Sequence, residues 1–161
     1  MGSTEKKFEN LNRVLNCNIQ RITFNRIDQE ELLKSFNDND GKSGAIVSFT
    51  GSVRNHSANG IVKGMYYEAY LGMAEEKIKD IENIVKEKWD INKIKIVHRI
   101  GELTIGDTSI IIIVSSYHSK NAFEACQFIL HKIKNEVPIW KRELLNDGNK
   151  RWIEGNSICS H

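Results

Sequence analysis

The sequence predicts an α+β fold, a single domain in which amphipathic helices pack on a mixed or antiparallel sheet. The chain has 161 residues, of which 40% are apolar, and this is enough for one core without metals or disulfides. Apolar runs of strand length alternate with segments of helical periodicity, and no internal repeat or low-complexity tract marks a second domain. We therefore expect one domain over residues 19–154, with flexible segments at 1–18 and 155–161.

The amino-terminal part predicts a strand followed by a helix. Ile19 to Phe24 alternates apolar and polar residues, as a half-buried strand does. Asp28 and Glu31 have the spacing of a capping box, which predicts a helix that begins there and runs through Phe36. Asn37 to Ser43 is rich in turn-forming residues and predicts a surface loop.

Two strands and a polar loop follow. The strands are predicted over Ala45 to Val53 and Met65 to Tyr70. Between them, Arg54 to Gly60 nearly lacks apolar side chains, which predicts a mobile loop of the kind that closes over ligands.

The middle of the chain predicts a helix and two strands. Met73 to Trp89 places apolar residues at helical spacing, with charged residues on the remaining face. Lys93 to Ile100 alternates isoleucines with mostly basic residues, and Ser109 to Ser116 is a β-branched run typical of a buried central strand. We expect a turn over Glu102 to Asp107 to join the two strands.

The last predicted helix covers Asn121 to Asn135, where apolar residues repeat on one face. Pro138 disfavours helical geometry at the residue before it, so the helix should end near Val137.

Charge and hydropathy exclude two classes of protein. There are 23 basic and 21 acidic residues, and the net charge of +2 argues against a nucleic-acid-binding surface, so any anion site must be local. The longest uncharged apolar run, Ser109 to Tyr117, is too short to cross a bilayer, and the amino terminus lacks the apolar stretch of a signal peptide. We expect a cytoplasmic protein without membrane contact.

The three cysteines are Cys17, Cys126 and Cys159, and they form no CxxC pair and no cluster with zinc-ligand spacing. We therefore expect no metal and a reducing compartment. Cys126 lies on the apolar face of the last helix and should be inert, and no cysteine has an activating motif. A persulfide sulfurtransferase that uses its own cysteine stays open as an alternative, and replacing all three cysteines would test it.

The densest group of polar residues is KNEVPIWKRE, from Lys134 to Glu143. If the part after Pro138 is extended, Lys141 and Glu143 share one face of the strand, whereas Trp140 and Arg142 share the other. Lys134 lies in the last helical turn, where the helix dipole favours its charged form, so its use as a neutral amine requires burial or neighbouring cations. The alternative is structural, since a lysine in a last turn is a common dipole partner.

Three residues outside this segment are also candidates for function. His118 precedes a helix amino terminus, where anions bind readily, although a cap or packing role is equally open. Arg54 ends a strand and could bind a phosphate, the alternative being a surface ion pair. His98 alternates with isoleucines, so we expect it in the core, and Trp140 taken alone is also expected there.

Several separated motifs carry a resemblance to a known family. They are GAIVSFTGSVRNH, YEAYLGMAE, HRIGEL, the HxxxAFEA pattern from His118 to Ala125, and KNEVPIWKRE. From Gly44 to Glu154 the sequence resembles the large, catalytic subunit of molybdopterin synthase. The first 43 residues carry little of this resemblance.

The resemblance implies an α/β hammerhead-type domain that forms a homodimer. Each copy would accept the tail of a small ubiquitin-like sulfur-carrier subunit, giving a heterotetramer. The implied activity is sulfur transfer from the thiocarboxylate of that tail to cyclic pyranopterin monophosphate, which forms the dithiolene that later holds molybdenum in the molybdenum cofactor. No cofactor and no cysteine is needed for this reaction.

The resemblance also implies roles for particular residues. Lys134 and Lys141 match the two essential lysines, Lys134 for acid/base or amine chemistry and Lys141 to stabilise anionic oxygen. The implied substrate-binding residues are those two lysines together with Ser52, Val53, Arg54, His118, Ser119, Arg142 and Glu143. The resemblance implies that Arg54 is contributed across the dimer. Ser119 stands where the family usually has Arg, which leaves Lys120 as a compensating phosphate contact of different geometry.

Two further alternatives remain at this point. A non-catalytic module could bind a phosphorylated ligand or RNA through the same basic residues, in which case binding would occur without turnover. A family member could also keep the dimer and the partner groove but lose efficient catalysis through Ser119.

Overall fold

A four-stranded sheet forms the centre of the computed structural model, which describes residues 21–37 and 40–153. Its strands lie in the order β1 (Ile22–Thr23), β5 (Lys93–Arg99), β7 (Thr108–Ser116) and β2 (Ala45–Ser52). β1 pairs in parallel with β5, and the other pairs are antiparallel. The predicted α+β class with a mixed sheet is confirmed.

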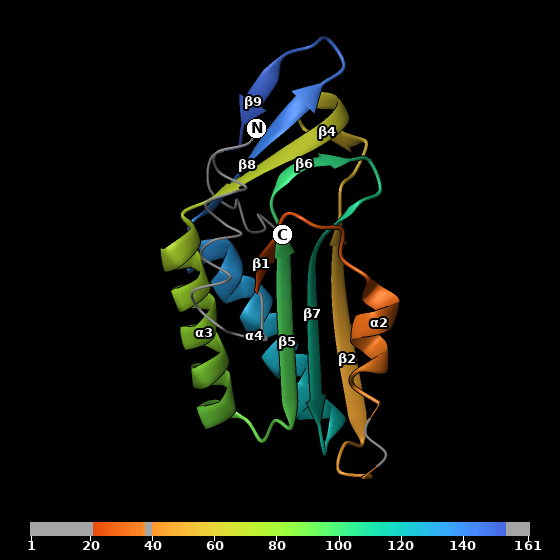
Figure 1. Ribbon diagram of the computed structural model, residues 1–161, viewed down its shortest axis with the longest axis vertical. Coiled ribbons are helices and arrows are strands. Elements are labelled where there is room, and N and C mark those ends of the chain that lie inside the picture. Colours follow the sequence, from red (N-terminus) through yellow and green to blue (C-terminus); the bar gives the residue numbers. More distant parts are fainter. Residues whose placement is uncertain (1–20, 38–39, 154–161) are drawn as a thin grey trace.

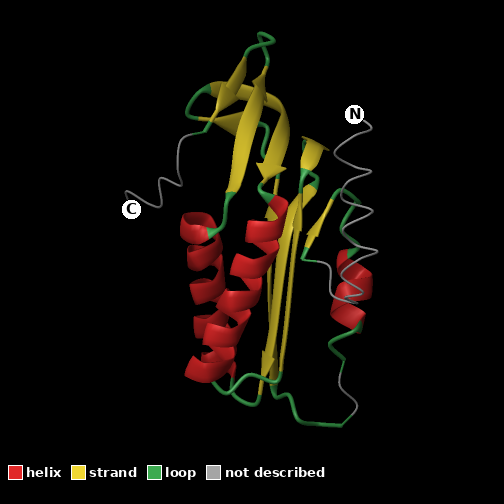
Figure 2. Ribbon diagram, turned by 60° about the vertical axis from the view of Figure 1, so that its left-hand side comes forward, coloured by secondary structure: helices red, strands yellow, loops and turns green. Residues whose placement is uncertain are grey.

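Helices cover both faces of this sheet. α3 (Leu71–Lys88) and α4 (Ser119–Glu136) lie side by side on one face, and the short α2 (Gln29–Lys34) lies on the other (Figures 1 and 2). The predicted end of the last helix is confirmed, because Val137 caps α4 directly before Pro138.

The helices explain why β7 is apolar without alternation. Ile110, Ile112 and Val114 face the cluster under α3 and α4, whereas Ile111 and Ile113 pack against α2 and its flanking residues. A strand that is covered on both faces needs apolar side chains on both, which is what the β-branched run predicts.

A second, smaller sheet stands at one end of the large one (Figure 1). It contains β3 (His56–Ser57), β4 (Gly60–Ala69), β8 (Ile139–Leu145) and β9 (Lys150–Trp152), and β6 (Gly101–Thr104) also pairs with β4. The turn predicted over Glu102 to Asp107 was therefore wrong for its first three residues, which belong to β6. β6 is short and its only buried residue is Leu103, so it lacks an alternating pattern.

The polar loop predicted between two strands also differs in the structure. β3 and the start of β4 form a short hairpin, in which His56 pairs with Ile61 and Ser57 with Gly60. Most residues of this hairpin are polar, so hydrophobic periodicity does not predict its strands. β9 was missed for the same reason, since all its residues are exposed.

Hydrogen bonds to two glutamates of α3 hold the first described residues in place. Arg21 donates two hydrogen bonds to the carboxylate of Glu82 on α3, at 3.0 and 2.8 Å, and the Ile22 amide donates to Glu75. Of the strand predicted over Ile19 to Phe24, the structure has Ile22–Thr23 as a strand, and residues 19 and 20 lie outside the described residues.

Some predictions fall beyond the part that the structure describes. The segments 1–18 and 155–161, with Cys17 and Cys159, lie outside it, and the proposed domain limits stay predictions. Within residues 21–37 and 40–153, no helix combines the length and the apolar character needed to cross a membrane.

Candidate active site

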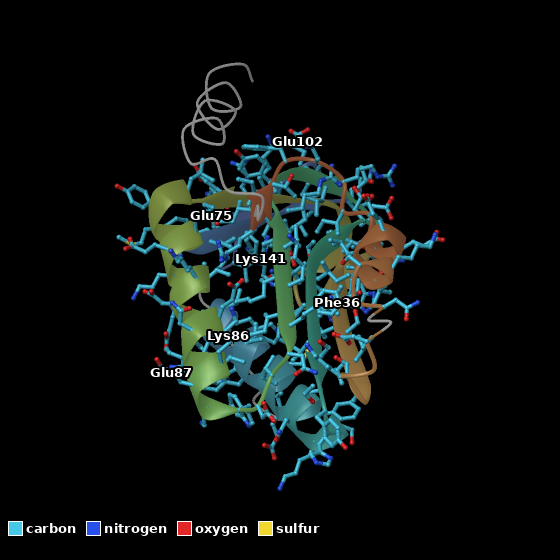
Figure 3. The ribbon with its side chains drawn as sticks, turned by 60° about the horizontal axis from the view of Figure 1, so that its bottom comes forward. Phe36, Glu75, Lys86, Glu87, Glu102 and Lys141 are labelled. Carbon is cyan, nitrogen blue, oxygen red and sulfur yellow. The ribbon has the colours of Figure 1, made fainter. Side chains whose placement is uncertain are left out.

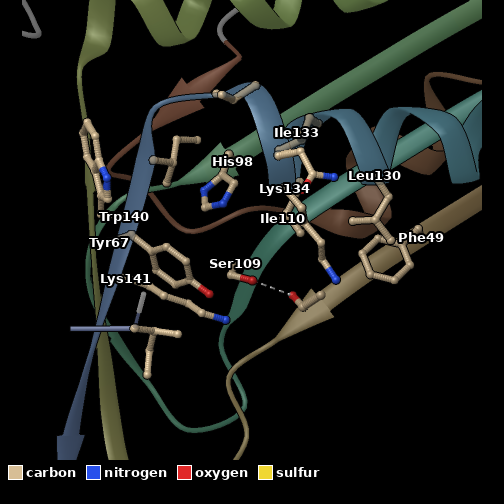
Figure 4. A pocket seen from close by; sticks show the side chains of 15 residues that line it. Phe49, Tyr67, His98, Ser109, Ile110, Leu130, Ile133, Lys134, Trp140 and Lys141 are labelled. Atoms are coloured by element: carbon tan, nitrogen blue, oxygen red, sulfur yellow. Dashed lines mark hydrogen bonds between the residues drawn. The ribbon is translucent and has the colours of Figure 1, made fainter. Parts of the chain in front are cut away.

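A cavity of about 480 Å³ lies where the small sheet meets the end of the large one. It is lined from strands of both sheets and from the last turn of α4, as Figure 4 shows. The lining residues are Phe49, Gly51, Tyr67, His98, Ser109, Ile110, Leu130, Ile133, Lys134, Asn135, Val137, Ile139, Trp140, Lys141 and Ile153.

The two lysines singled out in the sequence both line this cavity. Lys134 lies in the last turn of α4, and the chain passes through Pro138 directly into β8, which carries Lys141. Pairing of Lys141 with Tyr67 on β4 places both side chains on the cavity side of the small sheet. In Figure 3, Lys141 lies within the molecule, whereas Glu87 of α3 points outward.

The predicted division of β8 into two faces is confirmed. Lys141 is half-buried and Glu143 buried, whereas Arg142 lies on the opposite face between the rings of Tyr66 and Trp152. The prediction that Trp140 is a core residue was wrong, since its side chain is 50% exposed. It borders the cavity on the rim of the small sheet.

The surroundings of Lys141 lower the pKa of its amine. Burial lowers its pKa below the ordinary value of 10.5, the charge of Lys134 lowers it further, and Arg54 acts in the same direction while Glu143 opposes them. From the sequence, burial and neighbouring cations were expected to be needed at Lys134. The structure supplies both to Lys141.

Ser52, Val53 and Arg54 follow one another where β2 ends. Arg54 is exposed, and its charge acts on both Lys141 and Tyr67, which places it near the cavity. Val53 is buried and its amide donates to the carbonyl of Asp107 at 3.0 Å, so its side chain anchors the strand. Ser52 is exposed beside an irregularity in the pairing of β2.

The carboxylate of Glu143 faces the hairpin that follows Arg54. Its carboxylate accepts hydrogen bonds from the Ser57 hydroxyl at 2.9 Å and the Asn59 side-chain amide at 3.1 Å. It thereby ties the hairpin that follows Arg54 to β8. Neither Glu143 nor Arg142 lines the cavity.

His118, Ser119 and Lys120 lie at the opposite end of α4 from Lys134. The helix has 18 residues, so the two ends are about 27 Å apart. The His118 side chain makes no capping hydrogen bond, and Lys120 lies 3.9 Å from Glu124 in an exposed ion pair. Within one chain, these three residues do not reach the cavity.

Tyr67, His98 and Ser109 form a neutral polar wall of the cavity that was not predicted from the sequence. His98 is buried as predicted, and it also lines the cavity, edge-on to Tyr67 with the ring centres 5.0 Å apart. Burial raises the pKa of Tyr67, while a hydrogen bond with Ser109 opposes the shift. The signal that could have found this wall is His98, a polar residue at a position where the alternation of the strand predicts an apolar one.

Cys126 is buried among apolar residues, and burial raises the pKa of its thiol to about 11. The predicted burial of Cys126 is confirmed, and because a thiol is nucleophilic only as thiolate, a raised pKa supports the prediction that it is inert. The described residues contain no group of three or more His, Cys, Asp or Glu side chains that could hold a metal ion.

The sequence of the chain is similar to those of known proteins. The family model described as MoaE protein matches residues 22–136. The molybdopterin synthase catalytic subunit of Thermoplasma volcanium is 47% identical over 110 residues, which cover 68% of this chain and 80% of that protein.

Solved structures share the fold. The molybdopterin synthase structure from Staphylococcus aureus has a TM-score of 0.76 at 37% identity, covering 83% of this chain and 96% of that one. A complex of subunits 1 and 2 of molybdopterin-converting factor from Helicobacter pylori has a TM-score of 0.71 at 24% identity, covering 86% and 92%. Since the family model matches most of the chain and a relative of 47% identity is covered over most of its length, this chain belongs to the MoaE protein family, that of the molybdopterin synthase catalytic subunits.

Proposed function

We propose that the chain is a sulfurtransferase that moves sulfur from the carboxyl-terminal thiocarboxylate of a small ubiquitin-like subunit to cyclic pyranopterin monophosphate. Two rounds form the dithiolene of molybdopterin. The observation that carries this proposal is the pair Lys134 and Lys141 in one cavity, with burial and the charge of Lys134 lowering the pKa of Lys141. Membership of the MoaE family supports it.

The charges of the cavity suit two anionic reactants. A phosphate-bearing substrate and a thiocarboxylate repel each other, and Lys134, Lys141 and nearby Arg54 offset this repulsion. In each round the thiocarboxylate sulfur forms a bond to a substrate carbon while a carbon–oxygen bond of that carbon breaks and the oxygen takes up a proton. Water then cleaves the acyl–sulfur bond, so that sulfur stays on the substrate and the tail leaves as a carboxylate. Lys134 acts in proton transfer and Lys141 stabilises the oxygen on which negative charge develops.

The partner reaches the cavity through its tail. An extended peptide binds readily in a groove or along a strand edge, and the tail must place its terminal group beside the two lysines. The Helicobacter pylori complex of subunits 1 and 2, which has this fold, supports a small partner subunit. No cofactor takes part, and we place the reaction in the cytoplasm.

A second copy of the chain completes the anion site. His118, Ser119 and Lys120 lie about 21 to 24 Å from Lys134 along α4, so they act on substrate only if another copy brings them to the cavity. This supports a homodimer and, with two small subunits, a heterotetramer. Ser119 carries no charge, so Lys120 makes the phosphate contact at this position.

Reconstitution tests the proposal. The purified chain, a thiocarboxylated small subunit and cyclic pyranopterin monophosphate are combined, and dithiolene pterin is measured. We expect product from the wild type, and at least a hundredfold less from Lys134→Ala, on the order of what is lost when a catalytic acid or base is removed. The matched control is Lys86→Ala, which removes an exposed lysine from the last turn of α3 and should keep full activity.

Each outcome has a distinct meaning. Unfolding of Lys134→Ala would contradict the assignment, because an exposed lysine at a helix end contributes little to stability. Binding of the substrate by the wild type without turnover would favour a non-catalytic module. A stable complex with the small subunit but no product would point to Ser119, and Ser119→Arg should then restore activity.

A further inference from the structure

His98 is a buried polar residue for which the proposed chemistry has no use. It lies near the end of β5 with its side chain 7% exposed, and it lines the same cavity as Lys134 and Lys141. An apolar side chain at this position would avoid a free-energy cost, since burial of a polar group is unfavourable unless the group has a hydrogen-bond partner. The hydrogen-bond partners of its two ring nitrogens therefore indicate its role.

The first nitrogen is occupied. His98 Nδ1 lies 2.8 Å from the carbonyl oxygen of Arg99, and a carbonyl can only accept, so Nδ1 carries the proton. In the neutral ring, Nε2 then has a lone pair and no proton. The tautomer of His98 is therefore fixed by the backbone of the neighbouring residue.

The second nitrogen is an unused acceptor. No hydrogen bond to Nε2 occurs among residues 21–37 and 40–153, and none joins His98 to Lys141. Within that part of the chain, Ser115 Oγ is the only polar side-chain atom that is both enclosed and without a partner. Nε2 is thus accessible, and the space that its ring borders is the cavity.

We propose that His98 is a substrate-binding residue whose bare Nε2 accepts a hydrogen bond from an N–H group of a molecule bound in the cavity. The inference rests on the proposed function of this site. Two sources there offer such a group: the pterin ring of the substrate, and the main-chain amides of the partner's tail.

The surroundings keep His98 an acceptor at neutral pH. Burial, and after it the charge of Lys141, lowers its pKa from 6.5 to about 4, although the Arg99 carbonyl acts in the opposite direction. Tyr67 meets the ring edge-on and carries no charge at neutral pH, since burial raises its own pKa. The cavity thus presents cations for phosphate and thiocarboxylate, and beside them a neutral acceptor that a purely anionic ligand would not use.

Two variants separate the acceptor from the shape of the ring. His98→Phe keeps a ring of similar size without Nε2, and His98→Gln can place an amide oxygen near the position of Nε2. We expect His98→Phe to weaken binding by about tenfold, the effect of leaving one buried N–H without an acceptor. His98→Gln should regain most of that loss, and thermal unfolding of both variants monitors the fold.

Calorimetric titrations identify the donor. If it belongs to the pterin, His98→Phe weakens binding of cyclic pyranopterin monophosphate to the chain alone and leaves binding of the small subunit unchanged. If it belongs to the tail, the variant weakens binding of the small subunit only when its terminal residues are intact. If neither titration changes, the proposal is overturned.

Nitrogen NMR of the ring tests the same idea without activity. In the free wild type, one ring nitrogen of His98 should have the shift of an unprotonated nitrogen and the other that of a protonated one, with the signals assigned by their loss in His98→Phe. Binding of the ligand identified above should move the unprotonated signal toward that of a hydrogen-bonded nitrogen. A free protein with Nε2 protonated would overturn the inference, whereas loss of dithiolene formation alone would overturn only the proposed sulfur transfer.

Discussion

Lys134 and Lys141 line one cavity but differ in their surroundings. Lys134 is exposed at the end of α4, and Lys141 is half-buried on β8. Burial and the charge of Lys134 lower the pKa of Lys141. A lysine with a lowered pKa donates its proton more readily to an oxygen on which negative charge develops.

The coupling between the two lysines can be measured directly. Lys134→Ala removes the cation that, after burial, most lowers the pKa of Lys141, so that pKa should rise toward the ordinary value for lysine. NMR titration of the lysine side-chain nitrogens follows the change. Lys86→Ala serves as the control and should leave the pKa of Lys141 where it was; an equal shift in both variants would contradict the coupling.

The lowered pKa of His98 predicts how the stability of the fold depends on pH. Its pKa is about 4 in the folded chain against 6.5 for an ordinary histidine, so between these values the unfolded chain binds more protons. Stability contributed by neutral His98 is therefore complete above pH 6.5 and lost as the pH falls toward 4. At about 1.4 kcal/mol per pKa unit, the loss is roughly 3 kcal/mol.

The measurement is urea unfolding of the wild type and His98→Phe between pH 4 and 7. The wild type should lose more stability on acidification than the variant, because the phenylalanine cannot take up a proton. Parallel curves would show that His98 does not titrate in this way. Carboxylates titrate in both proteins, and their contribution cancels in the comparison.

At the scale of elements, caps and turns place the site. Asp28 accepts a hydrogen bond from the Glu31 amide at 3.0 Å and thereby begins α2, which helps to cover Phe36 on the large sheet. The stop at Pro138 is equally local, and it converts the helix that carries Lys134 into the strand that carries Lys141. Both features were predicted from sequence because they depend on neighbours within a few residues.

The cap of α2 gives a prediction on stability. Asp28→Ala removes the side-chain acceptor at the helix start and should lower the free energy of unfolding by about 1 kcal/mol. Chemical denaturation measures the difference. Glu30→Ala, which breaks only the exposed pair with Lys34, is the control and should cost less than half as much. A larger loss for Glu30 than for Asp28 would contradict the capping role.

At the scale of the whole molecule, the length of α4 separates the predicted site residues. Lys134, Lys141 and Arg54 gather at one end, whereas His118, Ser119 and Lys120 lie at the other. Exposed Tyr117 and Phe123 accompany the second group. A site that needs both groups requires two copies of the chain.

Complementation tests whether two copies share a site. Lys134→Ala and His118→Ala should each be inactive as homodimers. After unfolding and refolding together in equal amounts, half of the dimers are mixed and each contains one complete site, so about a quarter of wild-type activity should return. No recovery, despite dimers of normal size, would place both residues in the site of the same chain.

The sequence by itself determined the elements and the chemistry available to them. Apolar periodicity predicted the central strands and the two long helices, and local signals such as Asp28 and Pro138 set helix limits. The motif KNEVPIWKRE indicated that Lys134 and Lys141 act together. These features are encoded within a few residues, where side-chain period and backbone geometry decide the outcome.

Only the tertiary structure decided which residues meet. The register of β4 with β8 placed Tyr67 beside Lys141, and burial between two sheets made His98 a neutral acceptor in the same cavity. The short β6 and the exposed β9 form because β4 and β8 offer them free edges. Burial, pKa shifts and separations along a helix depend on residues distant in sequence, and for that reason no local pattern could fix them.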